Sequence, residues 1–331
     1  MTKQTRRRFI LGSAAGAVCA PYVTTAHAQA WPTKPIRIVC AYPAGGLTDI
    51  FARAYGEYLQ QKLGQPVTVE NRSGASGSLG ARAVKAAEPD GYTLMFTIAT
   101  ALLQNRVLLK NPGYDGDNDF VRIAHMSAGH LPTIAAKATG IRSIADLVAY
   151  AKQRDVSFGT FGPGSSAHIT AGVLNKLSGL TMKAVHYRGE APMWQDIAAG
   201  SIQAACGSYA AAQSVIAGDL GVPIAVPTLK RMRKLPDVPT FHEQGAADPA
   251  FEVSGFVGLV GPAGMPKEIV NRLSDLMVEA GKSARVQTIN DTFGIDEAAV
   301  SKAEFDQIYA KNGPILIQLV RDLNLAQMDV Q

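Results

Sequence analysis

The sequence predicts an α/β protein made of two lobes, each built on a mostly parallel sheet. From residue 36 onward, short β-rich runs alternate with segments of helical periodicity, which is the pattern of βαβ units with right-handed crossovers. The alternation falls into two series, one ending near residue 98 and the other beginning near residue 133. The length of 331 residues also suits roughly two domains.

The first series predicts three strands and two helices. Its β-rich runs lie at residues 36–41, 67–70 and 93–98. A helix over residues 49–63 places four apolar side chains on one face, namely Ile50, Ala54, Tyr58 and Leu59. A second helix covers residues 78–87 and ends at the turn formed by Pro89, Asp90 and Gly91.

The second series predicts five strands and three helices. The strands are expected at residues 133–136, 156–160, 183–187, 203–206 and 223–226. The helices are expected at residues 144–152, 166–177 and 192–199, with Gly200 closing the last one.

The C-terminal part predicts one more strand, at residues 256–261, and two helices. Pro266 at a first helical position opens the first of them. Ser301 and Glu304 form a capping box at the start of the second, which Pro314 is expected to kink or break.

The order of these elements predicts the domain organisation. Residues 29–130 and 255–331 form a discontinuous first lobe, and residues 131–254 form the second. Residues 1–28 have the features of an export signal, with a twin-arginine-like basic segment and an A-x-A cleavage site ending at Ala28. The alternatives are a buried N-terminal helix, or lipidation at Cys19, although the residues before Cys19 make a poor lipobox.

Charge and hydropathy exclude several classes of partner once the signal is removed. The signal holds four of the 32 basic residues and no acidic one, so 28 basic residues remain against 27 acidic residues. This balance removes the main support for a nucleic-acid or an anionic-membrane partner. After residue 30, no apolar run is long enough to span a membrane.

Two cysteines remain in the exported chain, Cys40 and Cys206. An oxidising compartment permits a disulfide between them. Both lie in apolar strand-like runs, which favours two buried thiols. Their spacing, like the scattered histidines, predicts no metal site.

The strongest local signal is a glycine-containing loop between the first strand and the first helix. Paired glycines let the backbone approach a ligand, and the following helix presents free N–H groups with partial positive charge, so an anion could bind there. The candidate binding residues of this loop are Tyr42, Pro43, Ala44, Gly45, Gly46 and Asp49. The alternative is a plain tight turn in which Asp49 caps the helix or complements its dipole.

A second loop has the same strand–loop–helix architecture. Its candidate binding residues are Phe161, Gly162, Gly164, Ser165 and His168. The simpler interpretation gives Ser166 the role of helix cap and His168 that of a structural hydrogen-bonding group. Open α/β sheets bind ligands at the carboxyl ends of their strands, so both loops could grip one anion from two lobes.

Lesser candidates are Ser76, Thr97, Thr100 and Arg188, each of which is more often plain loop or strand-end structure. Motifs of enzymes are absent from the sequence: there is no G-x-S-x-G, no H-E-x-x-H, no full G-x-G-x-x-G and no Walker lysine. We therefore expect no catalytic residues and no cofactor.

The chain resembles the Bug family, the periplasmic receptors of tripartite tricarboxylate transporters, over about residues 31 to 325. The resemblance rests on landmarks in order, none decisive alone: 31–39, 43–49, 69–72, 89–94, 162–168, 187–189, 235–240 and 261–264. It implies a two-lobed Venus-flytrap fold of the type II-like periplasmic-binding-protein class. It also implies that the two loops bind a ligand carboxylate through backbone N–H groups, hydroxyls and water.

The resemblance further implies a periplasmic receptor, expected to be a monomer, that delivers a mono- or dicarboxylate, aromatic acids included, to membrane permease subunits. The chain departs from the family pattern where Gln203 replaces a frequent acid and where Cys206, Gly207 and Ser208 replace an aromatic-plus-acid region. Small residues there would admit a bulkier ligand, and Gly207 is a candidate binding residue. Two rival functions stay open: a ligand sensor for a two-component system, which uses the same cleft, and an exported enzyme.

Overall fold

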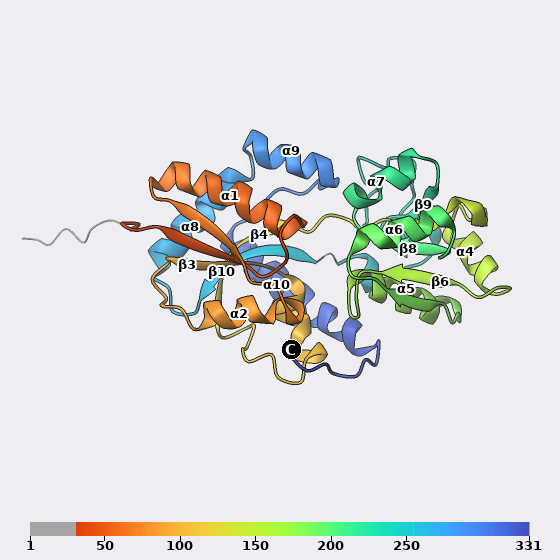
Figure 1. The fold of residues 1–331 in the computed structure, drawn as a ribbon, viewed down its shortest axis with the longest axis horizontal. Coiled ribbons are helices and arrows are strands. Elements are labelled where there is room, and N and C mark those ends of the chain that lie inside the picture. The colour runs from red at the N-terminus through yellow and green to blue at the C-terminus, as the bar shows by residue number, and fades with distance from the viewer. Residues whose placement is uncertain (1–30, 254, 331) are drawn as a thin grey trace, which may run out of the picture.

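The computed structural model describes residues 31–253 and 255–330, and these form two α/β lobes side by side (Figure 1). The predicted export signal lies outside the described residues. Each lobe contains a five-stranded sheet covered by helices. Among the described residues, no helix is both long and apolar enough to cross a membrane.

The first sheet has the strand order β2-β1-β3-β10-β4. Its strands are β1 (Ile36–Cys40), β2 (Val67–Asn71), β3 (Thr93–Ile98), β4 (Phe120–Ser127) and β10 (Phe256–Pro262). The pairs of β1 with β2 and β3 are parallel, whereas β10 is antiparallel to both of its neighbours. The helices of this lobe are α1 (Leu47–Leu63), α2 (Ser78–Lys85), α3 (Asn105–Leu108), α8 (Lys267–Ala280), α9 (Ala284–Phe293) and α10 (Lys302–Arg321).

The second sheet has the strand order β7-β6-β8-β5-β9. Its strands are β5 (Thr133–Ala136), β6 (Ser157–Thr160), β7 (Lys183–His186), β8 (Ala204–Cys206) and β9 (Gly221–Ala225). Here β5 is the strand that runs antiparallel to its neighbours. The helices are α4 (Ile144–Ala151), α5 (Ser166–Ser178), α6 (Glu190–Ala199) and α7 (Tyr209–Ala217).

The reversed strand of each sheet follows from how the chain enters the lobe. The strand β5 comes directly after β4 of the other sheet, and β10 is likewise the strand by which the chain returns to the first sheet. A strand that starts at the junction of the lobes runs away from the junction. Strands whose carboxyl ends face the junction run in the opposite direction. The sheets are therefore mixed, with most strands in one direction, and the carboxyl ends of β1, β3, β6 and β8 face the other lobe.

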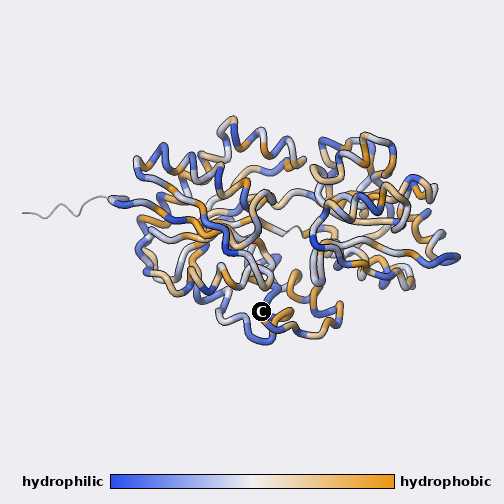
Figure 2. The backbone as a smooth tube through the Cα atoms, viewed as in Figure 1, coloured by the Kyte–Doolittle hydropathy of each residue, from blue (hydrophilic) through white to orange (hydrophobic). Residues whose placement is uncertain are grey.

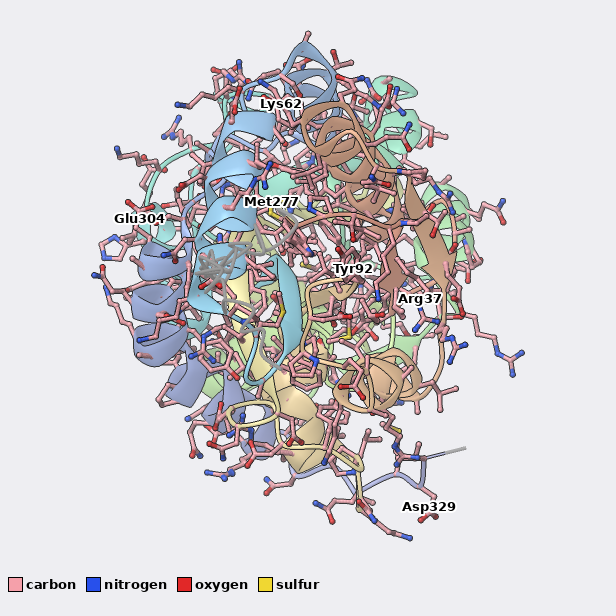
Figure 3. All side chains as sticks on the ribbon, turned by 90° about the vertical axis from the view of Figure 1, so that its left-hand side faces the viewer. Arg37, Lys62, Tyr92, Met277, Glu304 and Asp329 are labelled. Carbon is pink, nitrogen blue, oxygen red and sulfur yellow. The ribbon has the colours of Figure 1, made fainter. Side chains whose placement is uncertain are left out.

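The hydrophobic cores lie between the sheets and their helices. Figure 2 shows hydrophobic residues concentrated on the central strands of each lobe. At the outer end of the first lobe, Met277 is fully buried, whereas Lys62 and Glu304 lie at the periphery (Figure 3). Both Cys40 and Cys206 are free, buried thiols in different sheets, as predicted.

The end of α10 and the segment after it pack against the core of the second lobe. Val320 is buried in that core, and Leu323 and Met328 pack against it. Met328 also pairs with Leu109, which belongs to the same cluster. The boundaries predicted for the two lobes remain a proposal, because this C-terminal segment contacts both of them.

The predictions that Pro266 is the first helical residue and that Pro314 breaks its helix are wrong. Pro266 occupies the N-cap of α8 in an extended conformation and is not its first helical residue. The helix α10 continues through Pro314, because its Phe305 and Tyr309 on one side of the proline and its Leu316 on the other are buried against the same lobe. Burial on both sides outweighs the single backbone hydrogen bond that proline removes. Ser301 caps this helix, since its Oγ accepts from the Glu304 N–H.

Candidate functional site

A cavity of about 520 Å³ lies between the two lobes. Its volume is in the range of about 300–1,000 Å³ that is typical of small-molecule sites. Its walls are mainly apolar, and none of its lining residues is Lys, Arg or His. The lining residues are Gly45, Gly46, Leu47, Thr48, Ile98, Ala99, Thr100, Gln104, Ala128, Leu131, Phe161, Ser166, Glu190, Ser208, Ala210, Ala211, Gly255, Phe256, Val257, Phe293 and Leu316.

The loop before α1 brings the amino end of a 17-residue helix to this cavity. Gly46 is the N-cap and supplies no side chain to accept from the first N–H groups. Within the described residues, no acceptor bonds the N–H groups of Leu47 and Thr48. Such free N–H groups carry the positive end of the helix dipole and favour an anion.

Asp49 holds this loop in place rather than facing the cavity. Its carboxylate is almost fully buried and accepts from the Gly45 N–H at 3.0 Å, from Asn71 Nδ2 at 2.8 Å and from Arg53 Nε at 3.1 Å. Burial opposes ionisation, but hydrogen bonds from Arg53, Gly45 and Asn71 outweigh it and lower the pKa of Asp49. The carboxylate is therefore ionised and compensated by groups of the protein itself.

Tyr42 and Ser76 lie behind the loop and do not line the cavity. The Tyr42 hydroxyl donates to the Ser76 carbonyl at 3.1 Å, and Asn71 Nδ2 donates to the Tyr42 carbonyl at 3.0 Å. Burial raises the pKa of Tyr42 well above its ordinary value, so its hydroxyl keeps its proton. Pro43 and Ala44 are also outside the lining set.

The segment after β3 forms the next part of the wall. Thr97 is fully buried within the sheet, whereas Thr100 lines the cavity and donates from Oγ1 to Gln104 Oε1 at 2.6 Å. Residues Thr100–Gln104 form a π-helix. Single π-turns are rare and often occur at functional sites, which fits a wall residue of this kind.

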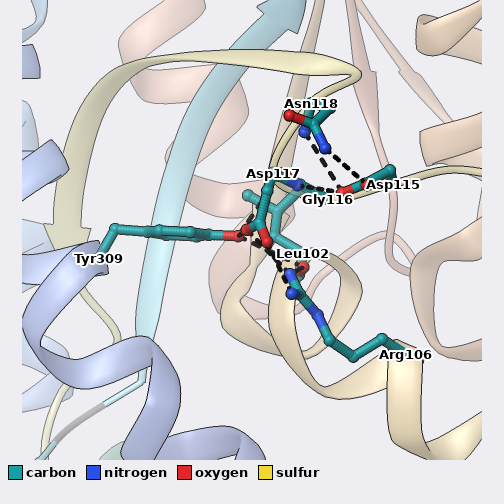
Figure 4. A network of polar contacts seen from close by, with 7 residues as sticks. All are labelled: Leu102, Arg106, Asp115, Gly116, Asp117, Asn118 and Tyr309. Atoms are coloured by element: carbon teal, nitrogen blue, oxygen red, sulfur yellow. Dashed lines mark hydrogen bonds and ion pairs between the residues drawn. The ribbon is translucent and has the colours of Figure 1, made fainter.

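A polar network behind the π-helix fixes its position (Figure 4). Arg106 binds Asp117 through two N–H groups, at 2.7 and 2.9 Å, and donates to the Leu102 carbonyl at 3.0 Å. Asp117 Oδ1 also accepts from the Tyr309 hydroxyl at 2.8 Å. The network thus ties α10 to the cavity wall.

Replacing Tyr309 by Phe tests this network. We expect the free energy of unfolding to fall by about 1 kcal/mol, because Asp117 loses one hydrogen bond. In a domain of this size, that corresponds to a fall in Tm of roughly 2–4 °C in a thermal melt. The matched control is Tyr150→Phe, since no described residue bonds the Tyr150 hydroxyl. An equal Tm for Tyr309→Phe and wild type would mean that the Tyr309 hydroxyl does not stabilise this network.

The loop before α5 brings a second helix amino end to the cavity, where Phe161 and Ser166 line the wall. The interpretation of Ser166 as the cap is wrong, because Ser165 is the N-cap: its Oγ accepts from the His168 N–H at 3.3 Å and donates to the Gly162 carbonyl at 2.7 Å. Ser166, one residue later, is exposed to the cavity.

His168 fixes the shape of this loop. Burial and the neighbouring His186 lower the pKa of His168, which favours the neutral ring. Its Nδ1 accepts from the Gly164 N–H at 3.2 Å, and its ring lies 4.7 Å from that of His186. Gly164 is needed because its φ is +71° and a Cβ there would lie 2.7 Å from Leu108.

A third helix amino end, that of α7, was not predicted. Ser208 is its N-cap, and Ala210 and Ala211 line the cavity. Glu190, the first residue of α6, lines the same part of the wall and accepts from the Ser208 N–H and hydroxyl, both at 2.8 Å. A serine before an alanine-rich run was the only local signal for this helix.

The predicted candidates therefore fall into two groups. Those that line the cavity are Gly45, Gly46, Thr100 and Phe161. Those that support or flank the wall are Tyr42, Pro43, Ala44, Asp49, Ser76, Thr97, Gly162, Gly164, Ser165, His168 and Gly207. Arg188 is exposed and is not part of the lining set. The binding role of each candidate remains a prediction.

The rim of the cavity joins the lobes where α7 packs beside α9 (Figure 1). Ion pairs from the second lobe reach the first there: Lys234 Nζ lies 2.8 Å from Asp291 Oδ2, and Arg233 Nε lies 3.0 Å from Asp296 Oδ1. The Arg233 side chain is exposed, whereas that of Lys234 is half-buried. Exposed ion pairs of this kind contribute little to stability.

Comparison with known proteins shows what the chain resembles. Residues 51–325 match the family described as the tripartite tricarboxylate transporter family receptor. A UPF0065 protein of Bordetella bronchiseptica is 34% identical over 76% of this chain and 74% of its own length. The structure of R. palustris Rpa4515 with adipate is 27% identical, with a TM-score of 0.78 over 90% of this chain and 100% of that one. The structure of MatC (Rpa3494) from Rhodopseudomonas palustris with bound malate is 25% identical, with a TM-score of 0.73 over 88% and 100%.

Proposed function

The chain belongs to the tripartite tricarboxylate transporter receptor family, whose Bug-type members are solute-binding receptors and not enzymes, and from this premise we propose that it captures a small carboxylate in the periplasm. The cavity between the lobes is the binding site. The loaded receptor delivers its ligand, as a monomer, to the membrane permease subunits of a tripartite transporter.

The observation that carries this proposal is the convergence of three helix amino ends on one cavity. The first residues of α1, α5 and α7 contribute to its wall from both lobes. Among the described residues, no basic side chain lines the cavity, so the donors available to an anion there are backbone N–H groups and hydroxyls. Backbone donors suit a carboxylate, which accepts several hydrogen bonds in a partly desolvated site.

Closure of the lobes follows from the same arrangement. A carboxylate that accepts from α1 in one lobe and from α5 or α7 in the other gains more hydrogen bonds when the lobes approach. The ligand thereby favours the closed state by its difference in affinity for the two states. The relatives solved with adipate and with malate support an organic acid as the ligand class.

A thermal-shift screen of purified protein tests the function. We expect organic acids to raise the Tm, with about 2.7 kcal/mol of added stability at a ligand concentration of 100 Kd. Neutral sugars and metal cations serve as negative controls, because the helix amino ends select negative charge. Stabilisation by sugars or cations, with none by any carboxylate, would overturn the proposal.

A further inference from the structure

One side of the cavity wall carries a carboxyl group that a simple anion site does not need. Glu190 lines the cavity beside the amino end of α7. Its Oε2 accepts three hydrogen bonds, from the Ser208 N–H, the Ser208 hydroxyl and Trp194 Nε1, the last at 3.4 Å. Among the described residues, no donor reaches Oε1 and no basic side chain pairs with Glu190.

The surroundings hold the carboxylate in one orientation. A Cβ at Gly207 would lie 2.9 Å from Glu190 Oε2 and 2.7 Å from the Trp194 ring, so only glycine leaves room for this arrangement. With Oε2 bound to Ser208 and Trp194, Oε1 is the oxygen left for a partner in the cavity. Burial raises the pKa of Glu190, whereas the hydrogen bonds from Ser208 and Trp194 lower it.

We infer that Glu190 determines specificity by selecting a carboxylate whose opposite end carries a hydrogen-bond donor and by rejecting dicarboxylates. The donor is a hydroxyl, an amide N–H or an ammonium group, and it binds the free oxygen of Glu190. The carboxylate of the ligand occupies the helix amino ends, and the apolar walls hold the chain between. This inference rests on the proposed function, because it assigns the second end of the same ligand.

Electrostatic repulsion disfavours dicarboxylates in this cavity. A second ligand carboxylate beside Glu190 places two negative charges together in a cavity lined by no Lys, Arg or His. Like charges at contact distance repel strongly when water is partly excluded. A hydroxyl or ammonium at the same place supplies a donor to Oε1, which no described residue bonds.

Calorimetric titration with four acids of one chain length tests the inference: hexanoate, 6-hydroxyhexanoate, 6-aminohexanoate and adipate. For the wild type, we expect the hydroxy or amino acid to bind at least about tenfold more tightly than adipate. Comparing 6-hydroxyhexanoate with 6-aminohexanoate shows whether the preferred donor is neutral or charged. In Glu190→Gln, the amide can donate to the second carboxylate of adipate. The ratio of the affinity for the donor-bearing acid to the affinity for adipate should therefore fall about tenfold, mainly through tighter adipate binding.

The control variant is Glu268→Gln, which removes the same charge from an exposed position in the first turn of α8. It should leave all four affinities unchanged. Adipate binding to the wild type as tightly as the donor-bearing acids would overturn the inference while leaving the receptor function intact. An equal change of all four affinities in Glu190→Gln would assign Glu190 a structural role and also overturn it. If no organic acid binds the wild type at all, the proposed function itself fails.

Discussion

Replacing Leu47 by Pro should weaken carboxylate binding about 10- to 100-fold. Leu47 is the first residue of α1, and its N–H is one of the free donors at the cavity. Proline removes that donor, and a hydrogen bond to a charged group contributes about 1.5–3 kcal/mol. Each 1.4 kcal/mol corresponds to about a factor of ten in Kd.

The substitution suits the local backbone, so the loss should be specific to binding. Proline is favoured at the first position of a helix, where the N–H has no partner in the helix. Gly46 has φ −80° and ψ 167°, which is the extended conformation required before a proline. We therefore expect the helix to form normally and the Tm without ligand to match that of Leu47→Ala, since both substitutions remove the Leu47 side chain from the core.

Leu47→Ala separates the donor from the side chain. The Leu47 side chain lines the cavity and packs against the core of the first lobe, and alanine removes it while keeping the N–H. Calorimetric titration of both variants with the best acid from the screen gives the comparison. Equal affinities for the proline and alanine variants would mean that the amino end of α1 does not bind the carboxylate.

Replacing Asp49 by Ala should destabilise the first lobe by about 3 kcal/mol. This value is at the lower end of the roughly 3–5 kcal/mol for removing one partner of a buried charge pair, because Arg53 is half exposed. The variant also leaves the Gly45 N–H without its acceptor and removes one of the two acceptors of Asn71 Nδ2. The expected fall in Tm is about 6–12 °C. The loop of the binding site loses its anchor, so carboxylate affinity should fall as well.

The effect of Asp49 should depend on pH in a defined direction. The folded-state pKa of Asp49 is lowered, so its stabilising contribution is complete above the unfolded pKa of about 3.9 and is lost as the pH falls through the folded pKa. The difference in unfolding free energy between wild type and Asp49→Asn should be constant near neutral pH and shrink below about pH 4. Denaturant titrations at several pH values measure this difference.

Asp275→Asn is the control, since Asp275 is exposed on α8 of the same lobe. It should cost little stability at any pH. A difference between wild type and Asp49→Asn that grows on acidification would contradict the assignment of an ionised, hydrogen-bonded Asp49.

The elements that the sequence predicted well are those with a clear local pattern. The strands at residues 93–98 and 133–136 were predicted with their observed bounds, because both are apolar runs with turn residues nearby. The strand β4 was missed because Arg122 and His125 interrupt its apolar pattern. Arg122 is accommodated there by an ion pair to Asp306 on α10, at 2.5 Å, which no local pattern reveals.

The sequence alone determined the fold class, the two lobes and the two loops that precede α1 and α5, since glycine content and hydrophobic periodicity act over a few residues. The tertiary structure decided which groups share the cavity. Ser208 and Glu190 lie 18 residues apart and meet through packing of α6 against α7. Packing also turned Asp49 away from the cavity and kept α10 helical through Pro314. These outcomes depend on contacts between distant segments, whose geometry is fixed only when the lobes are folded.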